Sequence, residues 1–73
     1  MGFALLEIVV LGHDLPEHGL RAGDLGAVVQ VYGREGLEVE FVRPSGQTKA
    51  LVTLRASDVR AIAQTDLLAV RTA

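Results

Sequence analysis

Cysteine and tryptophan are absent from this 73-residue chain, and aromatic residues make up only 4% of it. Without cysteine, neither a disulfide nor a thiolate metal site can stabilise so small a fold. A chain of this length buries only about 60% of the surface that its unfolded form exposes. A deep catalytic pocket is difficult to build at this size, so we expect no enzyme activity. We predict a single domain over residues 1–73, with its core over about 5–63 and a C-terminal tail over 64–73.

Basic residues are scarce in the first part of the chain. Residues 1–42 contain two, Arg21 and Arg34, against seven acidic residues, whereas residues 43–73 contain five against two. The basic excess of the second part is too small to indicate a nucleic-acid partner. The apolar run "FALLEIVVL" is interrupted by Glu7 and is far shorter than the ~20 residues of a membrane span. We therefore expect a cytoplasmic protein with no membrane contact.

Helical periodicity is also missing, because no 3.6-residue repeat of apolar residues persists over ten residues before the tail. Period-two alternation appears instead in "LEVEFVR", and other β-branched runs end at glycine or charged residues. A single helical turn is expected at "ASDV", with Ser57 as its N-cap. The predicted strands cover about residues 5–11, 25–32, 37–43, 48–55 and 59–63. The predicted fold class is all-β: a small five-stranded SH3-like barrel with a single helical turn before the last strand.

Turn residues separate the predicted strands. A sheet that closes over so few residues needs sharp bends, which glycine tolerates better than other residues. Pro44 sets the φ angle of one turn, and Asp24 is expected to cap another by accepting backbone N–H bonds. The predicted structural turn residues are Gly19, Gly23, Asp24, Gly26, Pro44 and Gly46. The predicted core is Ile8, Val10, Leu20, Ala27, Val29, Val31, Leu37, Val39, Phe41, Val52, Leu54, Val59 and Ile62.

No cofactor or catalytic motif is complete. "GLRAGDLG" lacks the spacing of a dinucleotide-binding loop and the lysine of a P-loop, and a strand rather than a helix follows it. Ser45 and Ser57 have no evident base in the sequence. Glu38 and Glu40 point to the same side of a strand, and we interpret them as a solvated face rather than an acid–base pair. We expect no catalytic residue and no cofactor.

The segment "HDLPEH" gathers four side chains that can bind a metal: His13, Asp14, Glu17 and His18. Pro16 prevents the helix that would place both histidines on one face. We interpret the cluster as a solvated loop and predict no metal site. The alternative is a weak surface site for Zn²⁺ or Ni²⁺.

The spacing Leu-Pro-x-x-Gly-Leu-x-x-Gly-Asp-x-Gly-x-Val-Val runs from Leu15 to Val29. Together with "LEVEFV" and "LVTLRASDVR", it resembles a family of short bacterial proteins described as a domain of unknown function, over about residues 7–62. The resemblance implies an SH3-like barrel, similar in outline to the small barrel subunit of the cyanobacterial NAD(P)H-dehydrogenase-like complex, and a larger protein partner. It implies no catalytic chemistry. "GDLGAVVQV" is also similar to the kernel of KOW-type ribosomal and transcription-factor barrels, without the basic loop residues of those modules.

The sequence predicts a non-catalytic protein-interaction module, which is an accessory or regulatory subunit for a larger protein partner or forms a homo-oligomer. Apolar residues exceed what so small a barrel encloses, and exposed apolar surface often marks an interface. Loops held by a sheet are natural contact sites. The predicted partner-binding residues are His13, Glu17, His18, Arg21, Tyr32, Leu67 and Leu68. The alternative is a KOW-like RNA- or ribosome-associated module that binds through Arg34, Arg43, Lys49, Arg55 and Arg60.

Overall fold

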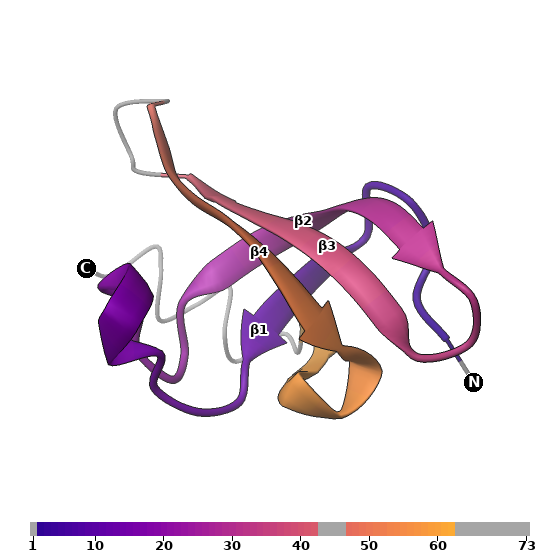
Figure 1. Cartoon of the computed structure of the whole chain (residues 1–73), viewed down its shortest axis with the longest axis horizontal. Helices are drawn as coiled ribbons and strands as arrows, with labels where there is room; N and C mark the ends of the chain where they lie inside the picture. Colours follow the sequence, from indigo (N-terminus) through magenta and orange to yellow (C-terminus); the bar gives the residue numbers. More distant parts are fainter. Residues whose placement is uncertain (1, 43–46, 63–73) are drawn as a thin grey trace.

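The computed structural model describes residues 2–42 and 47–62, with the backbone alone at residues 48 and 49. This part of the chain contains five β-strands, two short 3-10 turns and no α-helix, which confirms the predicted all-β class (Figure 1). It holds no helix long and apolar enough to cross a membrane. The strands are β1 (Ile8–Leu11), β2 (Leu25–Tyr32), β3 (Gly36–Val42), β4 (Thr48–Arg55) and β5 (Val59–Ala61), and the turns are η1 (Pro16–His18) and η2 (Ala56–Asp58).

The strand boundaries match the sequence pattern closely in the middle of the chain and less closely at its start. β2 and β4 cover the predicted residues, and β3 begins one residue earlier, at Gly36. The predicted first strand is three residues too long, because β1 begins only at Ile8. A turn precedes it, in which the Glu7 N–H donates to the Ala4 carbonyl oxygen at 3.1 Å. The apolar character of Leu5 and Leu6 therefore does not mark a strand.

The five strands form one antiparallel sheet in the order β4-β3-β2-β1-β5. In a flat sheet the two outer strands would lie about 19 Å apart, at ~4.8 Å per strand spacing. The chain from Arg55 to Val59 makes only four residue steps and reaches at most about 14 Å. The sheet must therefore curl to let η2 join its two edges. Within the described residues β4 pairs only with β3, so the sheet is open and the predicted barrel is not confirmed.

η2 connects parts of the fold that are distant in sequence. The Ala56 N–H donates to the Glu35 carbonyl oxygen at 2.7 Å, and the Gly12 N–H donates to the Asp58 carbonyl oxygen at 2.8 Å. η2 therefore contacts both the β2–β3 turn and the end of β1. The predicted N-cap was wrong: Ser57 lies inside the turn, and the Asp58 carboxylate accepts the backbone N–H of Arg55 at the start of the turn, at 2.8 Å.

The core lies on one face of the curled sheet. Its largest fully buried side chain is Phe41 of β3. Ile8, a predicted core residue, is 42% exposed, and Ala27 and Val29 are only half-buried. Val10 is buried as predicted but lies outside the contiguous core cluster. That cluster is Val9, Leu11, Leu20, Val28, Leu37, Val39, Phe41, Val52, Leu54 and Val59.

A β-bulge in β2 explains why the predicted faces of that strand were partly wrong. Val28 pairs with Val39, but the next pair is Gln30 with Glu38, so Val29 is an extra residue in β2. An extra residue changes which side chains face the core, because side chains alternate along a strand. Val28 is buried before the bulge, and Val31 packs against the core after it.

Gly26 was expected in a turn but lies inside β2, where it is buried. A Cβ at this position would lie 2.6 Å from Cγ1 of Val39 and 2.9 Å from the Phe41 ring. The core side chains of β3 therefore occupy the space that a larger residue would need.

The loop between β1 and β2 contains the turn residues that the sequence singled out. Gly19 and Gly23 have φ angles of 68° and 96°, which side chains with a Cβ rarely adopt. The Asp24 carboxylate accepts the Arg21 N–H at 3.0 Å. Pro44 and Gly46 lie outside the described residues.

Candidate functional site

An apolar groove of about 480 Å³ lies on the face of the sheet that points away from the core. Val42 of β3, at its wall, is 45% exposed. The lining side chains come from β1, β2, β3 and the residue after β5, so the groove crosses most of the sheet. They are Ile8, Leu25, Ala27, Glu40, Val42 and Ile62.

The strand register places the outward side chains of this face in rows. Ile8 pairs with Ala27, and Ala27 pairs with Glu40, so three strands contribute one row. Leu51 of β4 continues the row opposite Glu40 and is 54% exposed. The apolar face therefore extends beyond the groove to the β4 edge of the sheet. We call this row together with the groove the outer face.

The sequence predicted exposed apolar surface but did not locate the outer face, because Ile8 and Ala27 were assigned to the core. One signal was present in the sequence. In "LGAVVQVY" the residues that point to one face of the strand and those that point to the other are both mainly apolar. A strand with two apolar faces is typically buried on both.

An exposed leucine pair precedes β1. Leu5 and Leu6 are 60% and 76% exposed, and Leu6 has a φ angle of 67°. This left-handed conformation is unfavourable for a bulky residue. The turn is held by the Leu6 N–H, which donates to the Val28 carbonyl oxygen at 2.6 Å, and by the Glu7 carboxylate, which accepts the Ala4 N–H at 3.0 Å. Strained backbone clusters at functional sites such as ligand clamps and switch regions, so the exposed leucine pair is a candidate contact surface.

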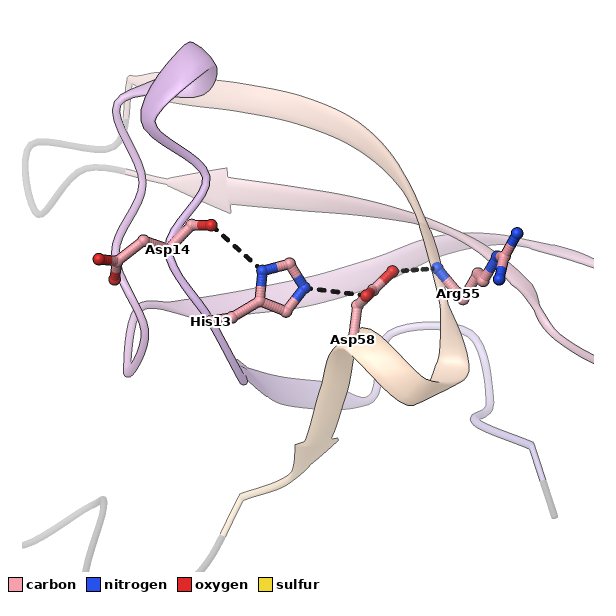
Figure 2. Close-up of polar contacts among 4 residues, drawn as sticks. All are labelled: His13, Asp14, Arg55 and Asp58. Carbon is pink, nitrogen blue, oxygen red and sulfur yellow. Dashed lines mark hydrogen bonds and ion pairs between the residues drawn. The ribbon is translucent and has the colours of Figure 1, made fainter.

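His13, the first predicted partner-binding residue, contacts two groups (Figure 2). Its Nε2 lies 2.9 Å from Oδ1 of Asp58, and its Nδ1 lies 3.1 Å from the backbone carbonyl oxygen of Asp14. The other oxygen of Asp58, Oδ2, accepts the Arg55 N–H. The contact joins the β1–β2 loop to η2, across 45 residues of sequence.

The electrostatics of this contact follow from its hydrogen bonds. The hydrogen bond to Asp58 raises the pKa of His13 above 6.5, and the one to the Asp14 carbonyl adds to the effect. The Arg55 N–H lowers the pKa of the Asp58 carboxyl below 3.8, and His13 lowers it further. At neutral pH the Asp58 carboxylate is therefore ionised.

The remaining predicted partner-binding residues do not form one site. Glu17, His18 and Arg21 are exposed on the β1–β2 loop, where Arg21 lines a small hollow of about 270 Å³. Tyr32 lies at the other end of β2, and its hydroxyl donates to the Glu38 carboxylate at 2.5 Å. That carboxylate raises the pKa of Tyr32 above 10.0. Leu67 and Leu68 lie outside the described residues.

The described residues do not bring together the side chains of the alternative metal site, His13, Asp14, Glu17 and His18. No group of three or more histidine, aspartate or glutamate side chains within residues 2–42 and 47–62 is placed to hold a metal ion. His13 contacts Asp58 instead, and the Asp14 carboxylate accepts the Ala22 N–H at 2.9 Å. These side chains have structural partners in the loop and in η2.

The fold and the outer face define a small all-β domain with an apolar surface. Comparison with family models assigns the chain more closely: residues 5–61 match DUF4926, a domain of unknown function, and the chain belongs to that family. Neither a curated protein nor a solved structure matches the chain.

Proposed function

We propose that this protein is a non-catalytic interaction module, an accessory or regulatory subunit, that binds a segment of a larger protein on its outer face. The observation that carries the proposal is the apolar groove with Ile8 and Val42 nearly half-exposed at its wall. Apolar patches of this kind on a soluble domain commonly mark interaction sites. The exposed pair Leu5 and Leu6 adds a second apolar contact surface.

The side chains that line the groove indicate the chemistry of the partner segment. Glu40 lies within the groove itself, next to Ala27 and Leu51 in the same row. The other side chains that line the groove are apolar, so a segment that presents apolar side chains is complementary to this surface.

The proposal includes the SH3-like barrel that the sequence predicts. Three features support it: β1 pairs with both β2 and β5, a long loop follows β1, and a 3-10 turn precedes β5. The four residue steps from Arg55 to Val59 already require strong curling of the sheet. The bacterial origin and the cytoplasmic location expected from the sequence belong to the same proposal.

The RNA-binding alternative receives less support. Binding of single-stranded RNA combines basic side chains with exposed aromatic platforms on which bases stack. Among the described residues, Tyr32 is exposed, but its hydroxyl is bonded to a carboxylate, and Phe41 is buried in the core.

The test is affinity capture from a host lysate with three forms of the tagged protein, each with and without nuclease. The forms are the wild type, Val42→Lys in the groove, and Gln30→Lys as a matched control at an exposed strand position outside the groove. A captured protein is then purified and titrated against each form. Val42→Lys is expected to weaken binding by at least about tenfold, equivalent to ~1.4 kcal/mol, and Gln30→Lys to leave it unchanged.

Three results would contradict the proposal. Equal binding of a captured protein by Val42→Lys and by the wild type would exclude the groove as the contact. Recovery of RNA or ribosomal proteins that disappears after nuclease treatment would favour the KOW-like alternative. If no protein is captured, the proposal that the chain binds a larger protein is contradicted. Circular dichroism of each form shows that the comparison is made between folded proteins.

A further inference from the structure

We propose that His13 is a pH-sensitive link: its doubly protonated ring holds the β1–β2 loop against η2 through two hydrogen bonds, and loss of one ring proton breaks one of them and loosens the loop. The inference concerns the conformation of the loop and does not depend on the proposed partner.

The geometry around the imidazole carries the proposal. Nε2 faces a carboxylate oxygen of Asp58 at 2.9 Å, and Nδ1 faces the carbonyl oxygen of Asp14 at 3.1 Å (Figure 2). Both oxygens can only accept hydrogen bonds, so both ring nitrogens must donate. A neutral imidazole has one N–H and can satisfy only one of the two contacts. The doubly protonated ring is therefore the form that fits this arrangement.

The contacts extend from η2 to the start of β2. Asp58 is held by the Arg55 N–H, and His13 connects Asp58 to the backbone of Asp14. The carboxylate of Asp14 in turn accepts the Ala22 N–H at 2.9 Å. Loss of one ring proton leaves a single N–H, so one of the two contacts of His13 in this series is lost.

The loosening is confined to the β1–β2 loop. The Gly12 N–H still donates to the Asp58 carbonyl oxygen at 2.8 Å when His13 is neutral, because that bond involves backbone atoms only. The His13 and Asp58 side chains are 52% and 27% exposed, so the ring can exchange protons with solvent. We expect residues 13–22 to become more mobile while the sheet stays intact.

The charged groups around the ring determine the pH range. They are the Asp14 carboxylate in the same loop, Asp58 in η2, and Arg55 at the end of β4, which acts on Asp58. The net effect is a pKa of His13 raised above 6.5, with the Asp58 hydrogen bond as the largest cause. Both contacts are then formed below pH 6.5 as long as Asp58 is ionised, and one of them is lost as pH rises through the pKa of His13 in the folded protein.

The experiment is an NMR pH titration of the ring protons of His13, combined with amide exchange at Ala22. Amides of β3 serve as the internal reference, because base-catalysed exchange accelerates at all sites as pH rises. In the wild type, the His13 midpoint is expected above 6.5, and protection at Ala22 relative to β3 is expected to fall through the same transition. His18→Gln is the control and should leave both observations unchanged.

Two variants separate the pH-sensitive link from a general structural role. Asp58→Asn keeps an oxygen that can accept the Arg55 N–H but removes the charge, and it should lower the His13 midpoint. His13→Gln should abolish the transition at Ala22. A wild-type midpoint at or below 6.5, or protection at Ala22 that does not change as His13 titrates, would overturn the proposal. If His13→Gln does not fold, the Asp58→Asn titration still decides the question.

Discussion

Gly26→Ala tests whether the β2–β3 contact leaves no space for a side chain. The added methyl group would lie 2.6 Å from Val39 and 2.9 Å from the Phe41 ring, so core side chains or the backbone would have to move. Overpacking of this kind destabilises proteins by about 1–3 kcal/mol. Alanine recovers about 0.5–1 kcal/mol relative to glycine within a strand. We therefore expect a net loss centred at about 1 kcal/mol, within roughly 0–2.5 kcal/mol, in the free energy of unfolding.

Urea unfolding followed by circular dichroism measures this loss. A chain of this length has a total stability of roughly 4–11 kcal/mol, so the variant should remain folded at low denaturant. Gly2→Ala is the control, because its Cβ would be 3.7 Å from the nearest atom, an ordinary contact.

A double-mutant cycle with Val39→Ala identifies the cause of the loss. Removal of Cγ1 from Val39 gives the new methyl group space on one side, while the Phe41 ring remains close. The Gly26→Ala loss should therefore be smaller in the Val39→Ala background, though not zero. An equal loss in both backgrounds, or a Gly26→Ala variant as stable as the wild type, would refute the steric argument.

Three further predictions concern Leu6, Asp24 and Tyr32. Leu6→Gly should raise the free energy of unfolding by up to about 1 kcal/mol, because glycine adopts the left-handed backbone of this exposed position without strain. Leu6→Ala keeps the strain and should give no gain in the same free energy. Asp24→Ala should lower the free energy of unfolding by about 0.5–2 kcal/mol in the same urea assay, because the Arg21 N–H loses its acceptor. Tyr32 is the single tyrosine, so the absorbance of its phenolate reports its titration directly. Its midpoint should lie above 10.0 and should move down in Glu38→Gln; a midpoint unaffected by Glu38→Gln would contradict the hydrogen bond.

Local sequence determined the strands and turns of the middle of the chain. The alternation in "LEVEFVR" depends only on the two-residue period of a strand, and it predicted β3 within one residue. The glycine and aspartate turn residues of the β1–β2 loop also act locally: Gly19 and Gly23 adopt positive φ angles, and Asp24 accepts an N–H three residues away. The lack of helical periodicity was sufficient to predict the all-β class.

Tertiary structure alone decided which faces of β1 and β2 are buried, and therefore where the candidate site lies. Ile8 and Ala27 are apolar, and nothing local distinguishes an inward apolar residue from an outward one. The bulge at Val29 reverses the pattern only because β3 pairs on both sides of it. The contact of His13 with Asp58 joins residues 45 apart and exists because the curled sheet brings η2 to the end of β1. Periodicity describes each strand by itself, whereas burial and contact depend on which other strand lies beside it.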